Sequence, residues 1–233
     1  MVDLSREMSA LAQRLGPPAG AVARVVQFVS ATSGEGTSTV AREFALEASR
    51  TAERGVWLIE LDLMRGEQHE AIAAEKRRYG ALGAAVRASP DESMFFALEP
   101  PADDEDGRPW PDVRYLAAYA VGGRRFWVTR FRREALRPGQ AARILAQPDY
   151  WRALRAHADW VVIDAPSADR SAAALAVAPC VDDTVLVVAG DTRHTRQASA
   201  LRQAVEAAGG RCPGFVFNRA RAEPPKFLQA LLP

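Results

Sequence analysis

Short, uninterrupted apolar runs alternate along the chain with stretches whose apolar residues recur every three or four positions. The runs are typical of strands buried on both faces, and the spaced pattern is typical of amphipathic helices. Their alternation predicts a doubly wound α/β fold with a mostly parallel sheet covered by helices on both sides. The expected strands are 25–29, 56–62, 113–120, 125–131, 160–164, 183–190 and 214–218, and the expected helices are 3–15, 37–53, 67–87, 148–158 and 195–208.

Polar stretches divide the chain into segments. Residues 88–112 are rich in proline and acidic residues, which predicts a long acidic surface loop. We expect a short helix and linker over 1–20, one α/β domain over 21–220 and a C-terminal tail over 221–233. With 233 residues, of which 48% are hydrophobic, the chain is large enough for one such core.

Composition narrows the expected location and partners. A net charge of +1 favours neither nucleic acid nor an anionic membrane. Cys180 and Cys212 lie far apart and fit a reducing compartment better than a disulfide framework. No apolar run approaches the roughly 20 residues that cross a bilayer, and the first residues are too polar for a signal peptide. We therefore expect a cytoplasmic protein, and one that is still able to dock on a membrane protein.

A loop of small residues follows the first predicted strand and precedes a helix. Residues 31–38 read ATSGEGTS, and phosphate-binding loops of this kind read G-x-x-x-x-G-K-[ST]. Gly36 and Ser38 match, Ala31 replaces the first glycine, and Thr37 replaces the lysine that reaches the terminal phosphates. Small residues let backbone N–H groups surround a phosphate, and the helix N-terminus adds a favourable partial charge. The segment therefore predicts a phosphate loop without its lysine.

Acidic residues end two of the predicted strands. Glu60 and Asp62 close the run 56–62, and Asp164 closes the run 160–164. Because ligands bind at the carboxyl ends of strands in such sheets, we expect these acids to lie beside the phosphate loop. A hydroxyl and carboxylates suit Mg²⁺, so Ser38, Asp62 and Asp164 form a candidate metal site. Alternatively, Asp164 does not bind a metal and instead caps the N-terminus of a helix.

Four segments together resemble a known family. VVQFVSATSGEGTSTVAREFA, VWLIELDLMRG, DWVVIDAPSAD and PGFVFNRA occur in that order between about residues 24 and 220. They are similar to the phosphate loop, the second acidic motif, the Walker B motif and the base-contacting strand of the cytoplasmic bacterial tyrosine kinases of capsule and exopolysaccharide synthesis. These kinases are related to the Min and Par partition ATPases, the group with a deviant Walker A motif.

The resemblance implies a P-loop fold that binds ATP or ADP with Mg²⁺. It also implies a partner, an inner-membrane polysaccharide co-polymerase or chain-length protein. By the resemblance, Asp62 and Asp164 would act in catalysis and, with Ser38, hold the metal. The nucleotide would contact Gly34, Glu35, Gly36, Thr37, Ser38, Thr39, Arg65 and Asn218.

The chain departs from the family pattern at three places. Thr37 takes the lysine position, Glu60 lengthens the first acid of the second motif, and the tail 221–233 has no tyrosine cluster. These changes predict weak or absent kinase activity. The alternative is an active ATPase or tyrosine kinase in which Arg65 or Arg42 takes the lysine's place, because a guanidinium suits phosphate.

Three functions are consistent with these residues. The first is a component of exopolysaccharide or capsule synthesis and export, for instance in a holdfast-type adhesive system. The second is the active ATPase or kinase. The third is a partition-type switch, in which helix 3–15 and the arginines of 124–137 bind membrane or DNA. Alternating aromatic and arginine residues in 124–137 also describe a half-buried strand, which we favour, so nucleic acid is not an expected partner. The sequence leaves the oligomeric state open, a homo-oligomer included.

Overall fold

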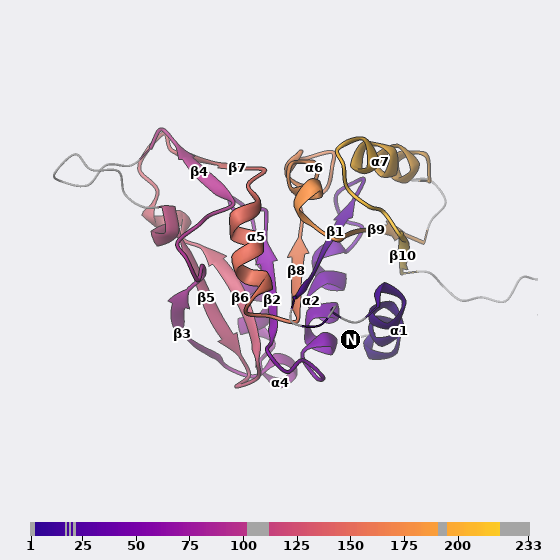
Figure 1. The fold of residues 1–233 in the computed structure, drawn as a ribbon, viewed down its shortest axis with the longest axis horizontal. Helices are drawn as coiled ribbons and strands as arrows, with labels where there is room; N and C mark the ends of the chain where they lie inside the picture. The colour runs from indigo at the N-terminus through magenta and orange to yellow at the C-terminus, as the bar shows by residue number, and fades with distance from the viewer. Residues whose placement is uncertain are drawn as a thin grey trace, which may run out of the picture.

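A computed structural model describes residues 3–16, 18, 20, 22–101, 112–190 and 195–219. A large sheet forms the centre, with helices on both of its faces (Figure 1). This arrangement confirms the predicted α/β class. The described residues include no helix long and apolar enough to cross a membrane. The acidic run 103–106 and the tail 221–233 lie outside the described residues.

The described part of the chain forms an eight-stranded sheet in the order β10-β9-β1-β8-β2-β6-β5-β3. From β10 to β6 every neighbouring pair is parallel, whereas β5 and β3 add to one edge as antiparallel strands. The sheet is therefore mostly parallel, as predicted. Its strands are β1 (Arg24–Ser30), β2 (Val56–Glu60), β3 (Leu82–Arg87), β5 (Leu116–Val121), β6 (Phe126–Phe131), β8 (Trp160–Asp164), β9 (Asp183–Ala189) and β10 (Gly214–Asn218).

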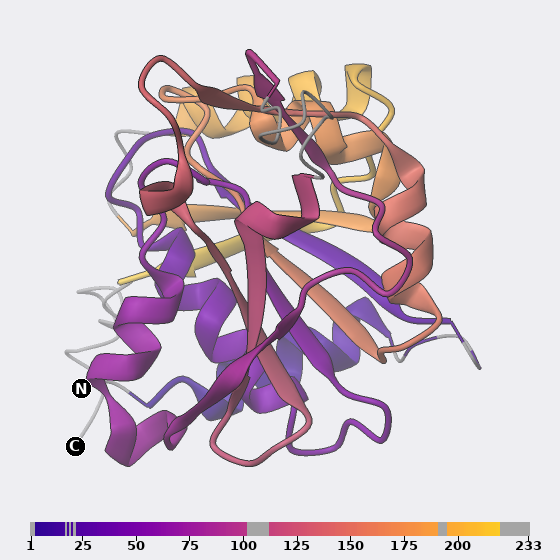
Figure 2. The same ribbon diagram turned by 90° about the vertical axis from the view of Figure 1, so that its left-hand side faces the viewer.

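Helices cover both faces of the sheet, and this is why its central strands are apolar throughout. Val26 and Phe28 of β1 pack toward one helical layer, and Val25 and Val29 pack toward the other. Figure 2 shows the sheet between α1 and α2 on one side and α6 and α7 on the other. The first layer holds α1 (Ser5–Leu15), α2 (Thr37–Ala48), α3 (Gln68–Ala74) and α4 (Lys76–Tyr79), and the second holds α5 (Pro148–Arg155), α6 (Ala173–Val177) and α7 (Thr195–Ala207).

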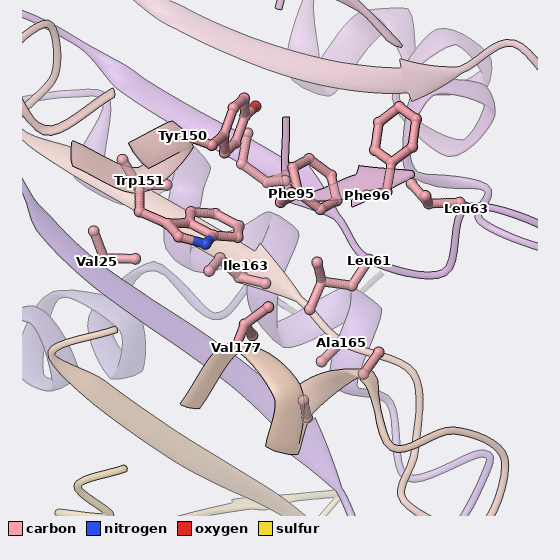
Figure 3. Close-up of a cluster of buried hydrophobic side chains, with 14 of the residues drawn as sticks. Val25, Leu61, Leu63, Phe95, Phe96, Tyr150, Trp151, Ile163, Ala165 and Val177 are labelled. Atoms are coloured by element: carbon pink, nitrogen blue, oxygen red, sulfur yellow. The ribbon is translucent and has the colours of Figure 1, made fainter. Parts of the chain in front are cut away.

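Aromatic side chains fill the core beneath α5. Trp151 is 1% exposed, and its ring lies 5.3 Å from that of Phe95 and 5.1 Å from that of Tyr150 (Figure 3). Ile163 of β8 belongs to the same cluster. This packing holds α5 against β8, the strand that ends at Asp164.

The expected helix over 67–87 is wrong in its second half. The helical part ends at Tyr79, and residues 82–87 form β3, which pairs antiparallel with β5. Gly80 has a φ of +88°, a left-handed conformation that ends the helix, and a side chain there would strike the backbone of Gly122. Backbone pairing at the edge of the sheet thus outweighs the helical preference of the alanines.

The expected surface loop 88–112 contains ordered, buried structure. Phe95 and Phe96 are 0% and 1% exposed, and residues Phe96–Glu99 form β4. This strand pairs antiparallel with β7 (Ala141–Ile144) as a separate two-stranded sheet. Short 3₁₀ turns follow at Asp112–Tyr115, Arg133–Ala135 and Ala178–Cys180.

Two further expectations concern α2 and the arginine-rich segment. α2 ends at Ala48, so the expected helix over 37–53 is too long by one turn. Within 124–137 the structure places β6, where Phe126, Val128 and Phe131 are buried and Arg130 is half-buried. The half-buried strand is confirmed, because the aromatic residues that could have stacked on nucleic-acid bases belong largely to the core.

Candidate functional site

The loop between β1 and α2 curls at the carboxyl edge of the sheet. Gly34 and Gly36 have φ of +87° and +88°, conformations that favour glycine. A Cβ on Gly36 would lie 2.1 Å from Nδ2 of Asn218, the last residue of β10. Asn218 donates from Nδ2 to the carbonyl oxygen of Glu35 at 2.8 Å. The end of β10 therefore fixes the loop. The resemblance implies that Asn218 contacts the nucleotide, whereas in the structure its amide nitrogen is bonded to the loop.

Carboxylates of the chain itself accept hydrogen bonds from the loop. Backbone N–H of Ser33 donates to Oδ2 of Asp169 at 3.1 Å. Glu35, 3% exposed, accepts from the backbone N–H of Thr32 and of Ala189 at 3.4 Å each. Two backbone N–H groups of the loop, those of Thr32 and Ser33, are thus bonded to carboxylates of the chain, and a bound phosphate would have to displace these carboxylates to use them.

Thr37 and Ser38 begin α2 at the end of this loop. Thr37 is 7% exposed, and its hydroxyl oxygen is buried without a hydrogen-bond partner. The residue that replaces the lysine therefore has a buried hydroxyl and brings no cation to the loop. Ser38 lies beside Asp164, and both line the same cavity.

A cavity of about 670 Å³ lies at the carboxyl ends of β1, β2 and β8. It brings together all but two of the predicted site residues. The exceptions are Glu35 and Asn218, which do not line it and are hydrogen-bonded to each other. Four arginines also line it, and two of them, Arg170 and Arg219, were not predicted from the sequence. The lining includes Gly34, Gly36, Thr37, Ser38, Thr39, Arg42, Glu60, Asp62, Arg65, Gln68, Asp164, Arg170 and Arg219.

Asp164 is the buried acid at the floor of this cavity. It is 4% exposed, and burial raises its pKa to about 6, against the opposing effects of the neighbouring Gln68 and Ser38. Its Oδ2 accepts from Nε2 of Gln68 at 2.7 Å, whereas Oδ1 is buried and has no hydrogen-bond partner. One carboxylate oxygen thus remains for a further ligand.

Glu60 pairs with Asp164 in the register of β2 and β8. Its carboxylate accepts from the backbone N–H of Glu67 at 2.9 Å and of Gln68 at 3.2 Å. Burial, followed by the charge of Asp164, raises the pKa of Glu60 to about 8. A Cβ on Gly66 would lie 2.0 Å from the carboxyl carbon of Glu60, so the lengthened acid fits only because the loop beside it has a glycine.

Asp62 lies at the cavity but is held by neighbours. Its carboxylate forms an ion pair with Arg170 and accepts from the backbone N–H of Arg65 at 3.1 Å. Arg170 follows the Walker B-like segment by a few residues, and only its position after a strand end could have pointed to it. Arg65 lines the same cavity, as the resemblance implies.

Arg42 extends from α2 toward the acids. Its NH1 donates to Oε1 of Gln68 at 2.8 Å and its Nε to the hydroxyl of Tyr79 at 3.0 Å. Gln68, at the start of α3, is 1% exposed. Gln68 was not predicted from the sequence. The only sign of its role is that it is a polar residue that follows shortly after a glycine.

The chain's residues fit a magnesium ion bound with a nucleotide. In the described ranges no group of three or more His, Cys, Asp and Glu side chains could hold a metal alone. Mg²⁺, however, is commonly bound through one or two side chains together with phosphate oxygens and water. The unpartnered Oδ1 of Asp164 beside the Ser38 hydroxyl supplies such a pair.

Solved structures with this fold include kinases and ATPases. The kinase domain of VpsO aligns with a TM-score of 0.57 and 17% identity, over 94% of this chain and 93% of its own. The kinase domain of the Escherichia coli tyrosine kinase ETK gives 0.54 and 17%, over 93% and 73%. MinD of Pyrococcus horikoshii, complexed with Mg-ADP, gives 0.53 and 14%, over 90% and 77%.

No protein-family profile and no curated protein matches the chain in sequence. The structural likenesses confirm the P-loop fold that bacterial tyrosine kinase domains share with Min-type ATPases.

Proposed function

We propose that the chain is a nucleotide-binding component of exopolysaccharide or capsule synthesis and export. It works at the cytoplasmic side of the inner membrane with a co-polymerase, and its kinase activity is weak or absent. The observation that carries the proposal is the cavity that joins the phosphate loop, Ser38 and Asp164. The fold shared with tyrosine kinase domains and the four sequence segments support the setting.

In this proposal the loop binds ATP or ADP through backbone N–H groups and the start of α2. Ser38 and Asp164 hold Mg²⁺, which neutralises phosphate charge when bound. Thr37 brings no charge to the terminal phosphates, so binding keeps the contribution of the loop but lacks that of a lysine. Loss of one well-placed cation costs a phosphoryl transfer several kcal/mol of barrier, which supports a role in binding rather than in catalysis.

The arginines that line the cavity favour one competing function, an active ATPase. Arg42 contacts Gln68 and Tyr79, and Arg170 contacts Asp62, so each would have to exchange these partners to reach a phosphate. Arg65 lines the cavity at its β2 side. If the wild type hydrolyses ATP and this activity is lost in Arg65→Ala or Arg42→Ala, the protein is an active ATPase and our proposal is wrong.

Replacing Thr37 by lysine is expected to raise the affinity for ATP and ADP by about 10- to 100-fold. A hydrogen bond to a charged group is worth about 1.5–3 kcal/mol, and 1.4 kcal/mol is a factor of ten. Calorimetric titration with Mg²⁺ measures both proteins, and a hydrolysis assay accompanies it.

Thr51→Lys is the matched control, since Thr51 is exposed and lies beyond the end of α2. It should bind as the wild type does. If neither the wild type nor Thr37→Lys binds nucleotide, the loop is not a phosphate site and the proposed function fails.

A further inference from the structure

The side chain of Gln68 spans the two residues that would hold the metal. Its Nε2 donates to the backbone carbonyl oxygen of Ser38 at 2.8 Å and to Oδ2 of Asp164 at 2.7 Å. Its Oε1 accepts from NH1 of Arg42 at 2.8 Å. Both N–H groups of the amide and its oxygen are thus engaged, and the side chain is buried.

Further hydrogen bonds hold Arg42, and through it Gln68. The hydroxyl of Tyr79 accepts from Nε of Arg42 and donates to Oε1 of Glu43 at 2.6 Å. Glu43 also forms an ion pair with Arg78. The series Glu43–Tyr79–Arg42–Gln68–Asp164 therefore runs without a break from α2, through Tyr79 of α4, to the floor of the cavity. Gln68 cannot rotate away without breaking several of its bonds.

The amide of Gln68 occupies one of the two carboxylate oxygens of Asp164 that a magnesium ion or its waters could use. An amide N–H and a metal-bound water are both donors to a carboxylate, and the N–H carries only a partial positive charge. With Oδ2 bonded to Gln68, Asp164 has Oδ1 alone for the metal shell. Arg42, bonded to the far side of the amide, holds Gln68 in this position.

We propose that Gln68 is a positioning residue that competes with the magnesium shell for one oxygen of Asp164 and so lowers the dependence of nucleotide binding on Mg²⁺. This inference rests on the proposed function, because it concerns the same cavity. It goes further by stating which side chain sets the metal requirement.

The test is the ratio of the ADP dissociation constants without and with about 5 mM Mg²⁺, the millimolar level at which weak sites fill. We expect a ratio below about threefold in the wild type and a ratio about tenfold higher in Gln68→Ala, the equivalent of one hydrogen bond to a charged group. A general loss of stability or of loop order would change both constants together and leave their ratio unchanged. Gln68→Asn, which keeps the amide but is too short to reach both partners, should shift the ratio in the same direction if the alanine variant folds poorly.

Gln140→Ala is the matched control, since Gln140 also bonds backbone and lies away from the cavity. It should leave the ratio at the wild-type value. Equal ratios in the wild type and both Gln68 variants would overturn the inference, as would a strong magnesium requirement in the wild type.

A second measurement separates this inference from the proposed function. If no variant binds ADP under either condition, the proposed function fails. The competition between Gln68 and a metal at Asp164 is then tested by measuring the binding of Mn²⁺ to the nucleotide-free protein with electron paramagnetic resonance. Tighter Mn²⁺ binding in Gln68→Ala than in the wild type would support competition at Asp164. Equal binding would refute it.

Discussion

Replacing Glu60 by glutamine is expected to abolish most of the decline in stability between about pH 6 and pH 8. The folded protein raises the pKa of this carboxyl from 4.5 to about 8, chiefly by burial and then by repulsion from Asp164. The folded state therefore keeps a proton that the unfolded chain has already released. Stability must fall as pH rises through the interval between the two pKa values, by up to about 1.4 kcal/mol for each pH unit.

Over those two pH units the wild type should lose about 2–3 kcal/mol of unfolding free energy. Asp164, whose pKa is raised to about 6, contributes a loss of the same sign mostly below this range. Urea denaturation at several pH values measures the decline. Glu67→Gln, a change at an exposed neighbour, should retain the wild-type slope. A wild type whose stability stays level from pH 6 to pH 8 would show that Glu60 is ionised in the folded protein.

Replacing Trp151 by alanine is expected to cost about 3–5 kcal/mol of unfolding free energy. Deleting a large buried aromatic side chain loses its transfer energy and leaves a cavity, which the rings of Phe95 and Tyr150 would fill only in part. Urea denaturation under one condition measures the difference. A cost below about 1 kcal/mol would contradict the packing of α5 that Figure 3 shows.

Trp151→Phe provides the matched comparison. The indole Nε1 of Trp151 is buried without a hydrogen-bond partner, so phenylalanine keeps a ring in place and removes an unsatisfied donor. We expect it to cost less than half as much as alanine. Equal costs for the two variants would mean that the indole nitrogen has a partner whose loss dominates.

The central sheet was predictable because its signal is strong and local. Runs such as 160–164 and 183–190 are largely apolar on both faces, and the structure places the buried strands β8 and β9 there. Such strands must lie between two helical layers, which by itself gives the class of fold.

The edge of the sheet was not predictable in the same way. Along β3 only Leu82 is even partly covered and the rest is exposed, so burial leaves no alternation in the sequence. Its alanines favour a helix locally, and only pairing with β5, distant in sequence, makes it a strand. β4 could have been found, since Met94, Phe95 and Phe96 form an apolar run within the acidic segment.

In the candidate site, the motif residues could be predicted and their partners could not. Gly36, Ser38 and Asp164 stand in recognisable patterns, and the structure brings Ser38 and Asp164 together. Gln68 and Arg170 matter through contacts with acids that only the folded chain places beside them. A single sequence has no pattern that reports such contacts.

The strand order has a consequence for how the protein reaches its folded state. The neighbours of β1 are β8 and β9, so the strand that leads into the phosphate loop pairs with segments more than a hundred residues later in the chain. Closing such long loops costs chain entropy before any contact repays it, and folds rich in distant pairings fold slowly. During synthesis the loop therefore stays without its neighbouring strands until β8 and β9 have left the ribosome. If the proposed function holds, affinity for nucleotide should appear only after β8 and β9 have joined the sheet.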